Sequence, residues 1–201
     1  MIVIGYSGHA YVACSILKAA GRNVTAYCDQ EEKSNNPFGL QYLGTESSAA
    51  ALQALQSHPF FIAIGNNGIR KKVYGTLRDK GVLPLNAIHP SAVICPSANI
   101  AANGVMIAAG ALIQPLAYIG NGVICNTGSI IEHECRVGDF AHIGPGTVLC
   151  GNVTVGENSF IGAGAVVRQG IRIGSNCIIG AGAVVIKDVP EAATVFGVPA
   201  R

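Results

Sequence analysis

The chain has 201 residues, of which half are hydrophobic and only 12% are charged, so its composition excludes a disordered chain. The formal net charge is +2 and no run of basic residues occurs, which gives no electrostatic basis for binding nucleic acid or an acidic membrane surface. We therefore expect the partners to be small molecules or further copies of the chain. No stretch is apolar for long enough to form a signal peptide or to insert into a membrane, and we expect a cytoplasmic protein.

The first residues predict a nucleotide-binding βαβ unit. A buried strand at residues 2–4 precedes Gly5–Ala10, a helical pattern follows and ends at Gly21, and a second strand at residues 24–28 leads to Asp29. This order is typical of a nucleotide site, although the GxGxxG fingerprint is missing. Glycines let a ligand approach the backbone, and a helix N-terminus offers free N–H groups to phosphate. The alternative is an ordinary tight turn.

Further short elements are expected up to the middle of the chain. They are a strand at residues 40–43, a helix at 47–55, a strand at 60–64, a helix at 69–80 and a strand at 83–88. Five basic side chains lie on the outer faces of the last helix, and we interpret most of them as solvent-exposed charges; they are Arg70, Lys71, Lys72, Arg78 and Lys80. The domain boundary is placed close to Leu85, which gives an α/β domain at residues 1–84 and a second domain at residues 85–201.

An aliphatic residue recurs at every sixth position through the second domain. Neither a helix nor a strand alternation generates a period of six, whereas a β-solenoid does, with one short strand and one corner per hexad. The repeating aliphatics, with smaller residues four places after each, should fill the interior. The repeat begins at Ile88, Ile94, Ile100, Met106 and Leu112, and we expect one extra residue between Leu112 and Ile119 to shift the register. It continues through Ile119, Cys125, Ile131, Val137, Ile143, Leu149, Val155, Ile161, Val167, Ile173, Ile179 and Val185.

The seven cysteines form no CxxC pair, and three of them, Cys125, Cys135 and Cys177, occupy inward positions of the repeat. We interpret the cysteines as small buried thiols rather than disulfides or metal ligands. No cluster of His, Asp and Glu has zinc spacing, and no Ser or Cys stands in a nucleophile motif. The sequence therefore predicts no metal and no acyl-enzyme chemistry.

The main candidate for chemistry is His133, which lies between Glu132 and Glu134. It follows an inward aliphatic by two residues, so we place it at a corner of the solenoid, outside the core. A carboxylate bonded to one ring nitrogen fixes the tautomer and leaves the other nitrogen free to accept a proton, as a general base requires. The alternative is one more polar residue on a solvated edge. His142 also points outward and by its pattern is a surface residue.

The hexads resemble those of the left-handed parallel β-helix acyltransferases, which typically form trimers with active sites between subunits. More narrowly, the chain resembles the bacterial UDP-amino-sugar N-acetyltransferases of the PglD type, which are related to sialic acid O-acetyltransferases. The resemblance implies a small N-terminal α/β domain followed by a C-terminal left-handed parallel β-helix. The motifs that carry it are Gly5–His9, Phe60–Asn67, Ile69–Lys72, Asn126–Cys135, Cys150–Val153 and Gly197–Arg201.

The resemblance also implies roles for individual residues. His133 would be the catalytic base, Glu134 would raise its basicity, and Asn126 would lie nearby. The sugar nucleotide would be bound by Ser7, Gly8, His9, Asp29, Gln30 and Gly65, where Gln30 replaces the second acid of an Asp-Asp pair with which the family contacts uracil. Acetyl-CoA would be contacted by His142, Gly151, Ala163 and Ala181, because small residues expose backbone N–H groups to the pantetheine amides.

The resulting expectation is an acetyl-CoA-dependent N-acetyltransferase. Its acceptor would be the 4-amino group of a UDP-linked 4-amino-4,6-dideoxy-N-acetylhexosamine, and its product a UDP-diacetamido sugar of the bacillosamine type for bacterial surface glycans. The alternatives are a sialic acid O-acetyltransferase, a GDP-perosamine N-acetyltransferase and a catalytically silent scaffold that binds a sugar nucleotide.

Overall fold

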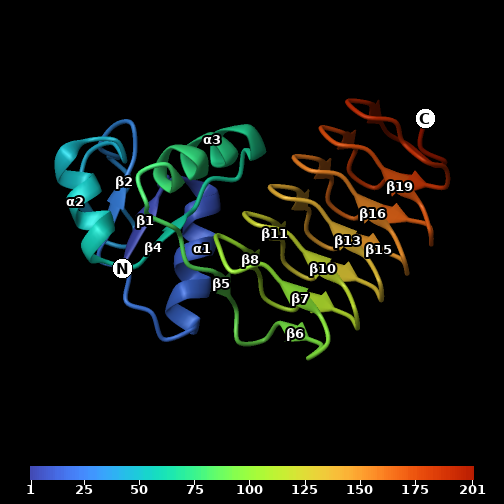
Figure 1. Ribbon diagram of the computed structural model, residues 1–201, viewed down its shortest axis with the longest axis horizontal. Helices are drawn as coiled ribbons and strands as arrows, with labels where there is room; N and C mark the ends of the chain where they lie inside the picture. The colour runs from blue at the N-terminus through green and yellow to red at the C-terminus, as the bar shows by residue number, and fades with distance from the viewer.

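The computed structural model describes residues 1–201, as a small α/β domain followed by a three-sided solenoid (Figure 1). The N-terminal domain contains a four-stranded parallel sheet in the order β3-β2-β1-β4. None of its three helices is long and apolar enough to cross a lipid bilayer. In chain order the elements are β1 (Ile2–Ile4), α1 (Gly8–Ala19), β2 (Ala26–Cys28), β3 (Gln41–Tyr42), α2 (Ala49–Ser57), β4 (Phe60–Ile62) and α3 (Asn67–Arg78).

The short strands of this sheet are apolar on both faces because helices cover both. Val3, Tyr27 and Phe61 pack with α1 on one side, together with residues of the solenoid. Their neighbours along each strand, among them Ile4 and Ile62, pack with α2 and α3 on the other side. This is the two-residue alternation of a strand, in a parallel sheet buried on both faces.

Each coil of the solenoid places one two-residue strand in each of three parallel sheets. The seven-stranded sheet consists of β5 (Ala87–Ile88), β8 (Met106–Ile107), β11 (Ile124–Cys125), β14 (His142–Ile143), β17 (Phe160–Ile161), β20 (Ile178–Ile179) and β22 (Thr194–Val195). The six-stranded sheet consists of β6 (Val93–Ile94), β9 (Leu112–Ile113), β12 (Ile130–Ile131), β15 (Val148–Leu149), β18 (Val166–Val167) and β21 (Val184–Val185). The five-stranded sheet consists of β7 (Asn99–Ile100), β10 (Tyr118–Ile119), β13 (Arg136–Val137), β16 (Thr154–Val155) and β19 (Arg172–Ile173).

The solenoid core agrees with the predicted repeat from Ile119 onward. The second residue of each strand and the residue four places later point inward, as Ile131 and Cys135 do with 0% exposure. All seven cysteines are free. Five of them are buried as predicted, namely Cys14, Cys28, Cys125, Cys135 and Cys177, whereas Cys95 and Cys150 are partly exposed.

The predicted position of the extra residue is wrong. Ile107 and Ile113 point inward, so Met106 and Leu112 are outer residues, and the seven-residue step falls between Ile100 and Ile107. The side chain of Asn86 fills the wider turn, because its amide donates to the Ala101 carbonyl (2.8 Å) and accepts from the Val105 N–H (2.9 Å). Met106 and Ile107 are adjacent apolar residues, as are Leu112 and Ile113, so the hexad pattern fits either residue of each pair as the inward one.

The N-terminal domain packs on the outer face of the seven-stranded sheet. The outer residues Ala87, Met106 and Ile124 are buried in one cluster with residues of β1 and α1. For the same reason His142, the next outer residue of this sheet, is only 7% exposed and is not the surface residue that its pattern predicted. The strand expected at residues 83–88 is limited to β5, and the expected boundary at residues 84–85 lies between α3 and β5.

Candidate active site

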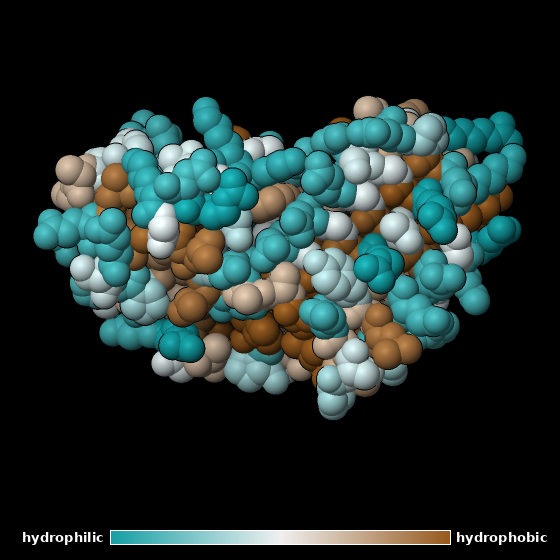
Figure 2. Space-filling view, in the orientation of Figure 1, coloured by the Kyte–Doolittle hydropathy of each residue, from teal (hydrophilic) through white to brown (hydrophobic).

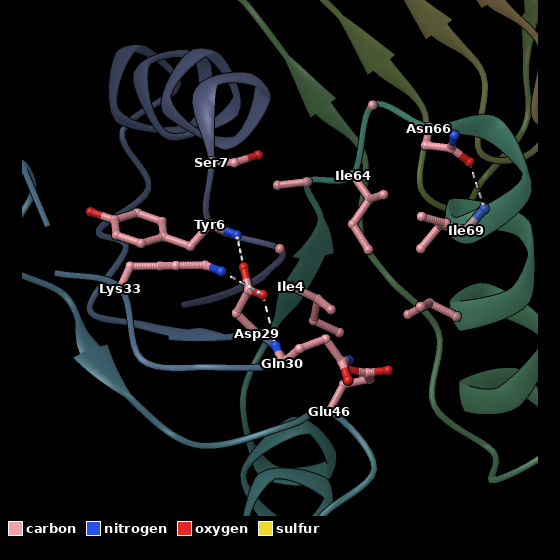
Figure 3. Close-up of a pocket in the computed structure, with 14 residues that line it drawn as sticks. Ile4, Tyr6, Ser7, Asp29, Gln30, Lys33, Glu46, Ile64, Asn66 and Ile69 are labelled. Atoms are coloured by element: carbon pink, nitrogen blue, oxygen red, sulfur yellow. Dashed lines mark hydrogen bonds and ion pairs between the residues drawn. The ribbon is translucent and has the colours of Figure 1, made fainter. Parts of the chain in front are cut away.

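A pocket of about 390 Å³ opens at the carboxyl ends of the parallel strands of the N-terminal domain (Figure 3). Open α/β sheets bind ligands at this edge, and a volume above about 300 Å³ is typical of a ligand site. Residues that follow each strand line it in the order of the sheet, namely Glu46 after β3, Gln30 after β2, Ser7 after β1 and Gly65 after β4. The pocket therefore crosses the whole sheet.

Asp29 organises one end of the pocket. Its Oδ2 accepts from the Tyr6 N–H (2.8 Å), and its Oδ1 accepts from the Gln30 N–H (2.7 Å) and lies 3.3 Å from Lys33 Nζ. Both carboxylate oxygens are thus engaged within the protein, and Asp29 shapes the turns after β1 and β2.

The first turn of α1 lies beside Asp29. Ser7 precedes this helix, but its side chain does not cap it, in contrast to Ser48 at α2 and Asn66 at α3. A helix N-terminus without a side-chain cap leaves N–H groups free for an anion. Of the predicted residues in this turn, Ser7 lines the pocket, whereas Gly8 and His9 do not.

A second pocket, of about 360 Å³, lies next to the first and reaches the solenoid. The two share Gly65 and Asn66, and the second extends to the outer residues Phe160 and Ile178 of the seven-stranded sheet, which are 39% and 49% exposed. The two pockets are therefore neighbours, bordered by the turn after β4, and the second lies between the N-terminal domain and the solenoid.

His9 points away from the first pocket, toward the solenoid, where its ring centroid lies 5.9 Å from that of His142. Asn126 Nδ2 lies 3.1 Å from His142 Nε2, and Asn126 Oδ1 accepts from the Thr127 N–H, so the amide donates to the imidazole. Burial, and then the charge of Arg70, lower the pKa of both histidines to about 4. Both are neutral near pH 7.

Arg70 ties the two domains together, although the sequence placed it on an outer face of the helix together with four other basic residues. It is 2% exposed, and burial lowers its pKa to about 9. Its five N–H groups have five acceptors: three in the N-terminal domain and two carbonyls in the solenoid. The acceptors are the carbonyls of Ile64, Gly65, Gly122 and Phe140 and Asn67 Oδ1, at 2.8–3.0 Å.

His133 lies at a different corner, after β12, and is exposed as predicted. Its Nδ1 is 3.1 Å from Glu134 Oε2, so a neutral ring donates from Nδ1 and keeps the lone pair on Nε2. The ring lies against Gly151 of the next coil, where a Cβ would stand 2.5 Å from both Cε1 and Nε2. Gly151 is therefore required for this position of the imidazole.

The predicted residues of the solenoid fall on two of its edges. Asn126, His142, Ala163 and Ala181 lie on or beside the edge between the seven-stranded and six-stranded sheets. His133, Glu134 and Gly151 lie on the edge between the six-stranded and five-stranded sheets. The six-stranded sheet separates the two groups, so one chain does not bring them together.

Comparison with known proteins identifies the family. Residues 1–77 match the model of the PglD N-terminal domain, and residues 152–187 match the bacterial transferase hexapeptide repeats. The perosamine N-acetyltransferase of Caulobacter crescentus, in complex with CoA and GDP-perosamine, is 39% identical with a TM-score of 0.93, covering 100% of this chain and 94% of that one. The acetyltransferase domain of PglB from Neisseria gonorrhoeae FA1090, in complex with acetyl coenzyme A, is 34% identical with a TM-score of 0.89, covering 100% and 97%.

The chain belongs to the hexapeptide-repeat acyltransferases that carry a PglD-type N-terminal domain. WeeI from Acinetobacter baumannii AYE is also similar, at 28% identity and a TM-score of 0.77, covering 100% of this chain and 97% of that one. The predicted family, fold class and enzyme class are confirmed for this hexapeptide-repeat acyltransferase. The roles of its individual residues stay predictions.

Two candidate functional residues of this acyltransferase were not predicted from its sequence. Arg70 was grouped with its basic neighbours because a lone arginine on a helix gives no sign of burial. Glu46 lies in the turn after β3, and its signal would have been an acidic residue following a strand paired with β2.

Proposed function

We propose that this protein transfers the acetyl group of acetyl-CoA to an amino group of a nucleotide-linked sugar. The observation that carries this proposal is the pocket at the carboxyl ends of the N-terminal sheet, bordered by Gly65 and Asn66, which also line a neighbouring pocket that reaches Phe160 and Ile178 of the solenoid. The relatives support both substrates, because one holds CoA and GDP-perosamine and another holds acetyl coenzyme A.

The order of the strands suggests how a sugar nucleotide would lie. The nucleoside would occupy the end at Asp29 and Gln30, and the diphosphate would meet the uncapped N-terminus of α1 at Ser7. The sugar would then pass Gly65 toward the solenoid. Acetyl-CoA would follow the edge beside His142, along which Ala163 and Ala181 are exposed.

The proposed chemistry is direct acyl transfer. The amine nitrogen attacks the thioester carbonyl carbon, the new C–N bond forms, and the C–S bond breaks as CoA leaves and takes a proton. His133 accepts the proton that the amine loses, on Nε2, while Glu134 holds Nδ1–H. Backbone N–H groups near the thioester carbonyl would stabilise the oxyanion.

The division of the predicted residues between two edges supports a trimer. If the six-stranded sheets of three copies faced a common threefold axis, the first edge of each copy would meet the second edge of its neighbour. The outer residues of that sheet are all aliphatic, namely Val93, Leu112, Ile130, Val148, Val166 and Val184. Figure 2 shows hydrophobic side chains at the surface of the molecule among polar ones.

The acceptor sugar has two candidates. The sequence-based expectation is a UDP-linked 4-amino-4,6-dideoxy-N-acetylhexosamine. GDP-perosamine is the second candidate, favoured by the 39–40% identity to the Caulobacter enzyme, against 34% to the PglB domain. Purified protein should be offered acetyl-CoA with each amino sugar and with sialic acid, and free CoA should be measured. If CoA were released only when sialic acid is the acceptor, the proposed N-acetyl transfer would be wrong and the activity would be O-acetyl transfer.

The assignment of the base is tested by His133→Ala. We expect kcat to fall by about 10²–10⁴, the usual contribution of a positioned acid or base, while acetyl-CoA binding measured by calorimetry is retained. His58→Ala, at the exposed C-terminal end of α2 and outside both pockets, provides the control. Turnover near that of the wild type in His133→Ala would refute the role of His133 as the base.

A further inference from the structure

We propose that the nucleotide base is guanine and that Gln30 and Glu46 read it. This inference rests on the proposed function, since it specifies the nucleotide that occupies the pocket of the N-terminal domain. Glu46 has no part in the roles that family resemblance assigns, and Gln30 stands where the family has an acid.

The fold brings these two side chains together at the end of the pocket farthest from β4. Gln30 follows β2 and Glu46 follows β3, and the strands run parallel, so their carboxyl ends share one edge. The turn after β3 is fixed by the Asp29 N–H, which donates to the Gly44 carbonyl (3.2 Å). As a result Gln30 Nε2 donates to Glu46 Oε2 at 3.4 Å, and the two side chains meet at the edge of the pocket in Figure 3.

Gln30 presents an amide donor beside the carboxylate of Glu46, and no cation is paired with this carboxylate. Lys33, the one basic residue that lines the pocket, is held by Asp29 and Glu31, and Glu46 forms no salt bridge. Asp29 cannot replace Glu46 in reading a base, because both of its oxygens are engaged by the protein. At this end of the pocket, the groups open to a ligand are therefore the Gln30 amide and the Glu46 carboxylate.

This pattern is complementary to guanine. The Watson–Crick edge of guanine carries one acceptor, O6, followed by two donors, N1–H and N2–H. The Gln30 amide can donate to O6 while the two oxygens of Glu46 accept from N1–H and N2–H. Uracil has a single donor, N3–H, between two acceptors, so one oxygen of Glu46 would face a carbonyl and repel it. A bidentate contact of this kind discriminates between bases by about ten- to hundredfold.

The test measures binding of GDP, IDP and UDP by calorimetry, without acetyl transfer. The wild type should bind GDP about ten- to hundredfold more tightly than UDP, and more tightly than IDP, which lacks the 2-amino group. Glu46→Gln should remove most of the GDP advantage over both, because the amide can accept only on its oxygen. Glu32→Gln, an exposed acid outside the pocket, is the matched control and should keep the wild-type order.

The outcomes separate this proposal from the proposed function. The reading of guanine would be overturned if the wild type bound UDP as tightly as GDP. It would also be overturned if Glu46→Gln weakened the binding of all three nucleotides equally, in a variant whose circular dichroism and melting temperature match the wild type. Acetyl transfer to a UDP-linked amino sugar would still be compatible with the proposed function. Failure of both GDP and UDP to bind would overturn the two together.

Discussion

The position of the proposed catalytic base, His133, depends on the absence of a side chain at Gly151. The His133 ring fills the space where a Cβ of residue 151 would stand, and Gly151 has an ordinary negative φ, so steric contact is the only obstacle to a side chain. The role that the resemblance implied for Gly151, a backbone contact to acetyl-CoA, is compatible with this packing, but the packing itself concerns His133.

Gly151→Ala should therefore impair catalysis without unfolding the solenoid. The new methyl group must displace the imidazole, and a shift of about 1 Å in a catalytic group can cost about 10² in rate. We expect kcat to fall by about that factor, while the melting temperature changes little because the ring is exposed. Gly75→Ala, on an open face of α3, is the control and should stabilise the protein by about 0.5–1 kcal/mol with normal kcat. Normal kcat in Gly151→Ala would contradict the role of this contact.

The half-buried His9 and the buried His142 should make stability depend on pH. Their pKa values are about 4 in the folded protein and 6.5 in the unfolded chain, so between these values the unfolded state binds more protons. The free energy of unfolding therefore falls as the pH drops below 6.5, by about 2 kcal/mol per histidine at pH 5.

His9→Gln isolates half of this effect. The substitution removes one titrating group, so the loss of unfolding free energy between pH 7.5 and pH 5 should shrink by about 2 kcal/mol. Any effect of the substitution on packing is the same at both pH values and cancels in this difference. Urea denaturation at the two pH values measures the loss. An unchanged difference between pH 7.5 and pH 5 would show that His9 is not held neutral by burial.

At the scale of elements, α3 matters because it carries the link between the domains. Arg70 binds the turn after β4, which borders both pockets, and two carbonyls of the solenoid. All five of its N–H groups are used, so it has none left for a substrate, and it acts by positioning.

Arg70→Lys tests this positioning. A lysine keeps the charge, but its three donors on one nitrogen cannot span acceptors on both domains. We expect kcat/KM for the sugar nucleotide to fall by about tenfold or more, with a much smaller change in KM for acetyl-CoA. Lys71→Ala removes the exposed interdomain pair with Glu157 (3.2 Å) and should have little effect. Equal losses for both substrates would indicate a general structural defect instead.

The same elements show what sequence could predict. Inward aliphatics and small residues gave the solenoid register from Ile119 on, because every coil repeats one steric constraint. The turn before Met106 could not be placed, since it depends on Asn86, which is distant in sequence. Burial of His142 and Arg70 likewise depends on how one domain covers the other, and a local pattern contains no information about such a contact.

At the scale of the molecule, the proposed trimer explains why the predicted site is split. The first edge of the solenoid contains His142 and the second contains His133, and the aliphatic six-stranded sheet lies between them. The five-stranded sheet has polar outer residues instead, which suit contact with water. They are Asn99, Tyr118, Arg136, Thr154 and Arg172.

A complementation experiment tests the sharing of sites between subunits. His133→Ala and His142→Ala, each inactive alone, should recover activity when co-expressed, because a mixed trimer contains one site built from two intact edges. Random mixing in equal amounts should restore about a quarter of the wild-type sites, as follows from threefold symmetry. Adding Ile130→Asp to both chains should abolish the recovery by placing a charge in the interface, whereas Thr154→Asp on the polar sheet should leave it intact. If co-expression gave no recovery although mixed trimers were isolated, each site would have to lie within one chain, and the proposed meeting of the two edges would be wrong.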